Sequence, residues 1–332
     1  MDLDTLWVGS EGGMEESLVK RQGIRFQTIP AAGVHGVGLA ALPRNFTMLG
    51  RGVLAARRLI NEFKPDVLFF TGGYVAVPVA LAGRSIASLL YVPDIEPGMA
   101  LRSLARFADV IAVTTDQSQQ FFKKQVFEAG YPLRADLPLW DRQTATQHLG
   151  ISSRLSVLLV FGGSKGAHSI NQAVMDNLPA LLNMFEIIHL SGEVDWQLIR
   201  QAREKLPMDL ADRYHALPYL HEMGAALASA DLVVSRAGAS CLGEYPLFGL
   251  PAVLIPYPHA WRYQKVNADY LTGRGAAIMV EDHRLNDDLL VTLNVLMENP
   301  NKLKAMRAAM FELSHPRAAE KIASALIELA GE

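Results

Sequence analysis

Short apolar runs alternate with amphipathic stretches along almost the whole chain. The apolar runs predict strands at residues 5–8, 25–30, 67–70, 89–92, 110–114, 157–163, 186–192, 214–220, 231–234, 252–256 and 276–280. Val67–Phe70 is apolar throughout, which is typical of a parallel strand buried on both faces. The segments between the runs predict helices. Strands and helices that alternate in this way predict an α/β protein with parallel sheets.

The clearest amphipathic helix of the first half begins at Phe46 and ends at Phe63, before Pro65. Its apolar side chains share one helical face: Phe46, Leu49, Val53, Ile60 and Phe63. Apolar and basic residues are mixed between Gly36 and Arg58, namely Leu39, Leu42, Phe46 and Leu49 with Arg44, Arg51, Arg57 and Arg58. This mixture predicts a peripheral face for an anionic membrane surface. The alternative is that the apolar positions are core and the arginines are only solvated.

The strand and helix pattern is interrupted at residues 135–153 and then starts again. We therefore predict an N-terminal domain at 1–136 and a C-terminal domain at 137–315. Each is expected to be a doubly wound sheet, with a cleft between the two. A helix that starts at Pro316 is expected to pack back on the first domain over residues 316–332.

Composition narrows the partners and the chemistry. A net charge of −3 over 332 residues gives no reason to expect nucleic acid. The single Cys241 excludes an intrachain disulfide and a CxxC metal site, and it fits a reducing cytoplasm. The nine histidines show no metal-binding spacing, so we predict neither a metal nor a cofactor. No apolar run reaches the length of a membrane span, so membrane contact is expected to be peripheral.

Small and polar residues follow two of the predicted strands of the second half. Residues 231–234 lead into the turn Arg236–Ser240 and a helix with Glu244 one turn in, and 252–256 lead into a loop with His259, Arg262, Gln264 and Asn267. Ligands of open α/β sheets bind at the carboxyl ends of the strands. A sugar nucleotide would suit these groups, with Glu244 on ribose, helix amides on phosphate, and Gln264 and Asn267 on sugar hydroxyls. The alternative is an ordinary strand–turn–helix unit with a polar loop.

Residues 162–167, GGSKGA, form a second glycine turn between a strand and a helix. Its backbone amides could face a phosphate, although it is neither a Walker loop nor GxGxxG. A plain tight turn explains the same residues.

These motifs together resemble glycosyltransferase family 28, and in particular its N-acetylglucosaminyltransferases of peptidoglycan synthesis. The resemblance runs from residue 5 to the end and rests on LWVGSEGGMEESLV, IPAAGVHG, KPDVLFFTGGYVAVP, GYPLRADL, VFGGSKGAHSIN, SRAGASCLGE, GLPAVLIPYPH and RYQKVNA. It implies a GT-B fold and a metal-independent, inverting transfer of N-acetylglucosamine from UDP to lipid I, giving lipid II. It also implies a peripheral protein on the cytoplasmic face of the cell membrane.

The resemblance also implies a set of substrate-binding residues. Arg134 would lie near the diphosphate, Ser164 in the glycine loop, Leu220 against uracil, Glu244 on ribose and Gln264 on the sugar hydroxyls. The full set is Arg134, Gly163, Ser164, Leu220, Arg236, Ala239, Ser240, Leu242, Gly243, Glu244, Gln264 and Asn267.

The chain departs from the family pattern at several positions. Asp94 replaces a donor-side asparagine, Ala76–Pro78 replace S-G-P, and Tyr263 replaces a glutamine. The family's first strand and glycine loop, which carry the proposed general-base histidine, do not precede Thr5 in this sequence. No general base is therefore assigned. We expect that Met1 is not the natural start or that the protein is impaired, because a strand would be missing between residues 5–8 and 67–70.

Two alternatives to the transferase stay open at this point. One is a non-catalytic or impaired sugar-nucleotide-binding relic, and the other is a related family 28 transferase with another lipid acceptor.

Overall fold

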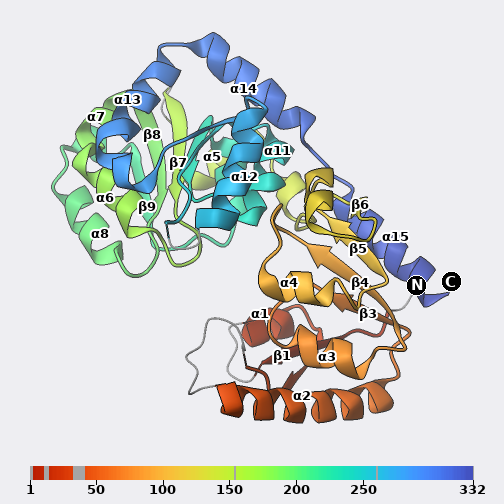
Figure 1. Cartoon of the computed structure of the whole chain (residues 1–332). Coiled ribbons are helices and arrows are strands. Elements are labelled where there is room, and N and C mark those ends of the chain that lie inside the picture. The colour runs from red at the N-terminus through yellow and green to blue at the C-terminus, as the bar shows by residue number, and fades with distance from the viewer. Residues whose placement is uncertain (1–2, 11–14, 33–41, 153–154, 259–260, 332) are drawn as a thin grey trace. The chain divides into compact units, whose positions relative to one another are not determined.

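The computed structural model describes residues 3–10, 15–32, 42–152, 155–258 and 261–331 (Figure 1). The chain divides into two compact units. The first comprises Met1–Pro93, Pro97–Ala129 and Glu320–Glu332, and the second comprises Asp94–Glu96 and Gly130–Ala319. The domain limits expected from the sequence stay predictions.

The described residues of the first unit form two parallel sheets. One pairs β1 (Leu6–Ser10) with β2 (Arg25–Ile29), and the other has the order β3-β4-β5-β6, with β3 (Val67–Phe70), β4 (Ala87–Val92), β5 (Val110–Val113) and β6 (Phe127–Glu128). Its helical elements are α1 (Glu15–Arg21), α2 (Leu42–Phe63), α3 (Ala76–Ala82), α4 (Met99–Leu104), the 3₁₀ helix η2 (Asp116–Phe121) and α15 (Ala318–Ala330).

Among the side chains that the structure describes, apolar residues of these elements form a larger and a smaller cluster. The larger cluster joins Leu68 of β3, Leu90 of β4 and Ile111 of β5 to Val79 of α3 and Ala56 of α2. In the smaller cluster Ile322 of α15 packs with Leu89, Tyr91, Ala112 and Ala129. The C-terminal helix is therefore part of the first unit, although the chain of the second unit precedes it.

The prediction that Val67–Phe70 is buried on both faces is wrong. Phe69 is 46% exposed, and among the described residues β3 pairs only with β4 and β1 only with β2. Leu68 and Phe70 are buried on one face of β3, whereas Val67 and Phe69 share the other face, which is only partly covered. The expectation of an additional strand between residues 5–8 and 67–70 stays a prediction.

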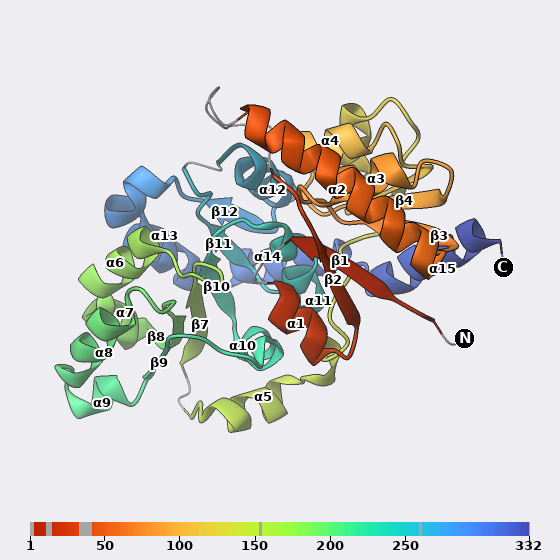
Figure 2. The same ribbon diagram turned by 90° about the horizontal axis from the view of Figure 1, so that it is seen from below.

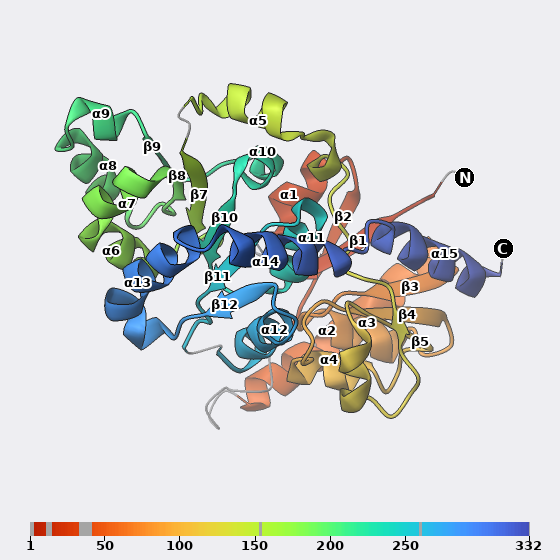
Figure 3. The ribbon, with the colours of Figure 1, turned by 90° about the horizontal axis from the view of Figure 1, so that it is seen from above.

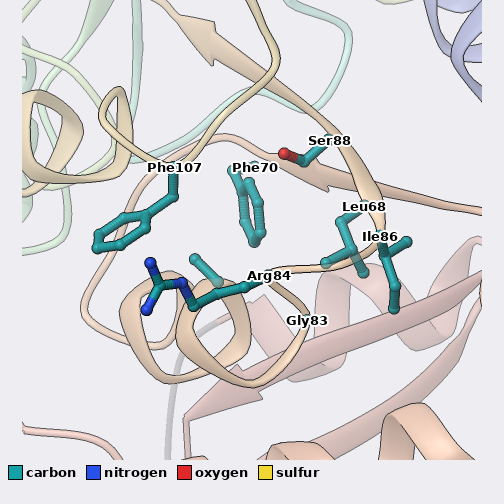
Figure 4. A pocket seen from close by; sticks show the side chains of 8 residues that line it. Leu68, Phe70, Gly83, Arg84, Ile86, Ser88 and Phe107 are labelled. Atoms are coloured by element: carbon teal, nitrogen blue, oxygen red, sulfur yellow. The ribbon is translucent and has the colours of Figure 1, made fainter.

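A small cavity lies in the first unit beside β3 and the end of α3 (Figure 4). It is lined by Leu68, Phe70, Ala80, Gly83, Arg84, Ile86, Ser88 and Phe107. The guanidinium of Arg84 lies 5.6 Å from the ring centre of Phe107 and helps to close it. None of the substrate-binding residues expected from the sequence lines this cavity.

The second unit is a single six-stranded parallel sheet in the order β12-β11-β10-β7-β8-β9. The strands are β7 (Ser156–Phe161), β8 (Phe185–Leu190), β9 (Tyr214–Leu217), β10 (Leu232–Ser235), β11 (Ala252–Leu254) and β12 (Ala277–Met279). Counted from β7, this order is 3-2-1-4-5-6, the order of a doubly wound dinucleotide-binding sheet. The α/β prediction and the doubly wound prediction are confirmed here.

Helices cover both faces of this sheet. They are α5 (Arg142–Leu149), α6 (His168–Asp176), α7 (Leu178–Met184), α8 (Trp196–Glu204), α9 (Met208–Ala211), α10 (Met223–Ser229), α11 (Glu244–Phe248), α12 (Trp261–Gly273), α13 (Leu285–Met297) and α14 (Pro300–Glu312), with 3₁₀ helices η3 (Leu137–Leu139), η4 (Ala239–Leu242) and η5 (Asp282–Arg284). Figures 2 and 3 show α6, α7 and α8 on one side of the strands and α11 and α12 on the other. The main core joins β7, β8, β10 and β11 to α6, α7 and α13.

Candidate active site

The site expected from the sequence lies where the sheet of the second unit reverses its winding. β7 and β10 are neighbours, with register pairs Leu158↔Leu232 and Phe161↔Ser235. The chain leaves β7 toward β8 and leaves β10 toward β11, on opposite sides. A crevice forms outside the carboxyl ends of two strands whose connections diverge in this way. The glycine turn 162–167 and the turn after Ser235 both lie at this point.

The glycine turn after β7 has a backbone that only glycine adopts readily. Gly163 and Gly166 have φ angles of 94° and 77°, and the Gly166 amide donates to the Gly163 carbonyl at 2.9 Å. A β-carbon on Gly166 would lie 2.0 Å from the Ser191 carbonyl oxygen. Gly163, Ser164 and Lys165 are exposed, and α6 begins directly after Ala167. The turn therefore presents its exposed backbone at the start of a helix.

A buried polar network supports this turn from behind. The Asn171 amide of α6 donates to the Ser191 carbonyl at 2.9 Å and to Oδ2 of Asp195 at 2.7 Å. Oδ1 of Asp195 lies 3.0 Å from Nδ1 of His168, whose side chain is 72% exposed. His168 therefore has a fixed ring orientation at the first residue of α6. The sequence pattern did not single out this network, because its members come from α6 and from the segment between β8 and α8, which are separated in sequence.

Arg236 follows β10 and has a largely buried side chain, 10% exposed. Its guanidinium pairs with Asp282 of η5 and donates to Ser169 Oγ of α6 at 2.8 Å and to the Ile255 carbonyl at 3.3 Å. These contacts tie together the ends of β10, β11 and β12. Arg236 was expected among the substrate-binding residues. In the structure its guanidinium is paired with Asp282 inside the second unit.

Glu244 is the first residue of α11, separated from η4 by Gly243, rather than one turn into a helix as the sequence suggested. The short 3₁₀ helix takes the place of that first turn. Burial raises the pKa of the Glu244 carboxyl, while the Arg134 guanidinium and a hydrogen bond with Ser240 oppose this rise. Glu244 is thus a half-buried carboxylate near an exposed arginine at the switch point.

Gln264 and Asn267 lie on α12, not in a loop as expected, because the helix begins at Trp261. Oε1 of Gln264 accepts from the Tyr257 amide at 2.8 Å. His259, also expected in this loop, lies outside the described residues, as does the side chain of Arg262. The helix places Gln264 and Asn267 one turn apart on the same side.

Asn267 is completely buried, and the protein itself satisfies its amide. Nδ2 donates to Oδ1 of Asp94 at 2.8 Å and to the Ala237 carbonyl at 3.1 Å, and Oδ1 accepts from the Ile95 amide at 3.2 Å. Asn267 therefore joins the segment Asp94–Glu96 to the turn after β10. The expected contact of Asn267 with the sugar stays a prediction.

Asp94 lies in the second unit although it follows β4 of the first in sequence. Burial raises the pKa of its carboxyl, and the hydrogen bond from Asn267 opposes the rise. Burial, together with the negative charges of Glu244 and Asp94, raises the pKa of Tyr131 to about 12. In the sequence Asp94 is only a departure from the family pattern, and only the fold brings it beside Asn267 and Tyr131.

Two further features concern the part of the chain that the structure describes: metal sites and membrane spans. There, no group of three or more His, Cys, Asp or Glu side chains could hold a metal ion. No described helix is both long and apolar enough to cross a membrane.

Comparison with known proteins assigns the family. Residues 157–322 match the model of the glycosyltransferase family 28 C-terminal domain, and residues 2–113 match that of the family's N-terminal domain. The chain belongs to glycosyltransferase family 28.

Family 28 relatives match nearly the whole chain. A protein of Roseiflexus sp. (strain RS-1) is 41% identical over 361 residues, which cover 96% of this chain and 82% of the relative. A protein of Desulforudis audaxviator (strain MP104C) is 37% identical over 348 residues, which cover 100% of this chain and 91% of the relative. Both are named UDP-N-acetylglucosamine--N-acetylmuramyl-(pentapeptide) pyrophosphoryl-undecaprenol N-acetylglucosamine transferase.

Solved structures agree with this assignment. The crystal structure of Acinetobacter baumannii MurG has a TM-score of 0.75 and 26% identity, covering 97% of this chain and 90% of that one. A UDP-GlcNAc 2-epimerase of Neisseria meningitidis bound to UDP-GlcNAc has a TM-score of 0.65 at 12% identity, covering 97% of this chain and 91% of that one, a likeness of fold alone. The chain thus has the GT-B fold expected from the sequence.

The family 28 residues expected to bind substrate lie toward the carboxyl ends of the strands of the second unit. Those after β7 and β10 are neighbours: Gly163, Ser164, Arg236, Ala239, Ser240, Leu242, Gly243 and Glu244. Burial raises the pKa of Glu244, and Arg134 is close enough to oppose this rise. Leu220 follows β9, which is separated from β7 by β8. The roles of these residues in binding stay predictions.

Proposed function

We propose that this chain is an inverting hexosyltransferase that moves N-acetylglucosamine from UDP-N-acetylglucosamine to undecaprenyl-pyrophosphoryl-MurNAc-pentapeptide. In shorter terms, it converts lipid I to lipid II in peptidoglycan synthesis. The observation that carries this proposal is the match of nearly the whole chain, at 41% and 37% identity, to two relatives named for that transfer. The switch point in the strand order of the second unit supports it, because nucleotides bind at such points in open α/β sheets.

The donor is proposed to lie across the ends of β7 and β10. The exposed backbone of Gly163 and Ser164 would donate to the diphosphate, and the positive charge of Arg134 would add to this field. Glu244 would accept from the ribose hydroxyls. Its raised pKa reflects a carboxylate that burial has partly stripped of water, and two hydroxyl donors would restore that lost solvation.

The reaction is a single displacement at the anomeric carbon. An acceptor hydroxyl oxygen forms the new bond while the bond to the UDP oxygen breaks, and that oxygen leaves with the electron pair. Amides and cations aimed at the diphosphate stabilise the charge that develops there. A base takes the proton of the acceptor hydroxyl. No described residue is assigned that role.

We further propose that the protein works as a peripheral protein on the cytoplasmic face of the membrane. Arg44, Arg51 and Arg58 are exposed on α2 at seven-residue spacing, and Leu54 between them is 59% exposed. This stripe supports contact with an anionic surface. Of the apolar residues first expected there, Leu39 lies outside the described residues, as does Gly36, and so do the side chains of Leu42 and Phe46. Leu49 is half-buried.

A transfer assay tests the proposed function. The purified chain, given radiolabelled UDP-N-acetylglucosamine and a lipid I analogue, should release UDP and label the lipid in equal amounts. UDP-glucose in place of the donor should give much less product. UDP binding without transfer to lipid I or to any other lipid acceptor would favour the non-catalytic relic. Transfer to a different lipid alone would favour the related transferase.

A further inference from the structure

A histidine and an aspartate meet beside the glycine turn that follows β7. Nδ1 of His168, the first residue of α6, lies 3.0 Å from Oδ1 of Asp195, which lies between β8 and α8. The turn packs against the end of β8, because a β-carbon on Gly192 would lie 2.4 Å from the Lys165 carbonyl oxygen. The imidazole and the carboxylate therefore lie at the carboxyl ends of β7 and β8, directly after the turn that is proposed to bind the diphosphate.

The hydrogen bonds behind Asp195 fix which ring nitrogen of His168 carries a proton. The Asn171 amide donates to the Ser191 carbonyl and to Oδ2 of Asp195. Asp195 is thus held as a carboxylate, which can only accept, and it accepts from Nδ1 of His168. Nε2 makes no hydrogen bond to the described residues, and the His168 side chain is 72% exposed. In the neutral ring this Nε2 has only a lone pair, whereas in the charged ring it is a hydrogen-bond donor.

A diphosphate has the polarity that the charged ring requires. Its ionised oxygens accept hydrogen bonds, so Nε2 can meet one of them only when the ring carries a proton on both nitrogens. Histidine side chains ordinarily gain or lose this charge between about pH 5 and 8, so such a contact would make binding depend on pH. Other charged groups lie on the neighbouring segments: Lys165 in the turn, Glu193 before Asp195, and Arg236 and Asp282, which are both bonded to Ser169.

We propose that His168 is a further catalytic residue of the transferase, whose charged ring donates from Nε2 to a phosphate oxygen of UDP. Negative charge grows on the UDP as its bond to the sugar breaks, and a cation already in place stabilises that charge. The ring takes up one proton from solvent when the donor binds and returns it when UDP leaves. Asp195 is a positioning residue that holds the ring through Nδ1. This inference deepens the proposed function and rests on it, because it presumes a UDP-sugar at the switch point of the second unit.

The first test separates the phosphates from the nucleoside. In His168→Asn the amide can still donate to Asp195, but nothing remains at the place of Nε2. Calorimetry at pH 6.5 should show that this variant binds UDP about tenfold more weakly than wild type and binds uridine equally well. His283→Asn is the matched control, since His283 is 75% exposed and its Nδ1 also lies near a carboxylate, 3.5 Å from Glu281. Unchanged UDP affinity in His168→Asn, or an equal loss for UDP and uridine, would overturn the assignment.

The second test counts protons. Calorimetry at pH 7.5 in two buffers of different ionisation enthalpy gives the number of protons taken up with each UDP. Wild type and His283→Asn should take up more than His168→Asn, and uridine should give no difference among the three. Equal uptake with UDP in wild type and His168→Asn would mean that His168 does not become charged on the diphosphate.

Asp195→Asn tests the positioning role. An amide at residue 195 would donate to Nδ1 of His168, and the proton of the neutral ring would then lie on Nε2. We expect proton uptake with UDP to fall to the value of His168→Asn, while more of the UDP affinity is kept than in that variant. If Asp195→Asn weakens UDP and uridine equally and keeps the wild-type proton uptake, the role of Asp195 is structural and the positioning role is wrong.

The transfer assay tests the catalytic role. His168→Asn should lower kcat by a larger factor than it raises the KM for UDP-N-acetylglucosamine, because the charge on UDP is greatest in the transition state. An unchanged kcat would overturn the catalytic role. A wild-type protein that binds UDP but transfers nothing would overturn the proposed function, whereas the binding tests would still decide whether His168 meets the diphosphate.

Discussion

At the scale of single residues, burial shifts the pKa of carboxyl groups at the switch point of the second unit. Burial raises the pKa of Glu244, so its charged form is destabilised in the protein without ligand. A carboxyl group with a raised folded pKa lowers stability above that pKa, so its loss should not harm the fold near pH 7. We predict that Glu244→Gln leaves the melting temperature unchanged or higher, yet weakens UDP binding by about 1–3 kcal/mol. Calorimetry and thermal melting measure the two effects.

Glu298→Gln is the matched control, since Glu298 is exposed at the end of α13. It should change neither quantity. Unchanged UDP affinity in Glu244→Gln would remove Glu244 from the ribose site.

At the scale of elements, a buried histidine joins two strands to a helix. His189 of β8 is completely buried between the Tyr214 hydroxyl of β9, at 2.7 Å, and Asn171 of α6, at 3.0 Å. Burial lowers its pKa from 6.5 to about 4, against the pull of Asp195. Below pH 6.5 His189 becomes protonated in the unfolded chain, whereas in the folded protein it stays neutral down to about pH 4. Stability that is present at pH 7 is therefore lost as the pH falls toward 4, by about 3 kcal/mol from this residue.

We predict that His189→Gln has a lower free energy of unfolding at pH 7.5 but loses less of it between pH 7.5 and 4.5 than wild type. Urea unfolding at the two pH values gives both numbers. His283→Gln, which changes a side chain that is 75% exposed, should keep the wild-type pH dependence. Equal losses in wild type and His189→Gln would mean that His189 takes up its proton in the folded state.

At the scale of the whole molecule, the exposed basic stripe of α2 predicts how the protein meets its lipid substrate. Each basic residue near an anionic surface contributes roughly 1 kcal/mol, and salt screens this attraction. We predict that vesicles with anionic lipid retain the protein at low salt and release it at high salt. The double variant Arg51→Glu/Arg58→Glu should lose this retention in a sedimentation assay. Arg200→Glu/Arg274→Glu, which reverses two arginines of the second unit, should keep it. If the vesicles retain Arg51→Glu/Arg58→Glu as well as wild type, the membrane-binding face lies elsewhere on the protein.

The succession of elements could be predicted from the chain because it depends on local patterns. Apolar runs such as Val157–Phe161 must be covered on both faces, and helices between them supply that cover. The family motifs led to the glycine turn and to Glu244 because both are contiguous in sequence. The exposed face of β3 could not be predicted, since what covers each face of a strand depends on tertiary packing.

Only the tertiary structure decided which contacts the polar residues near the switch point of the second unit make. From the sequence, Gln264 and Asn267 had the same expected role, as amides near a strand end. In the structure Asn267 is buried and its amide donates to Asp94, which lies 173 positions away in the sequence. Arg236 likewise meets Asp282, 46 positions on. Local sequence determines which hydrogen-bonding groups a chain carries. Whether such a group is free for a ligand depends on the distant residues that folding brings within 3 Å of it, because a buried polar group must be satisfied by whatever lies nearest.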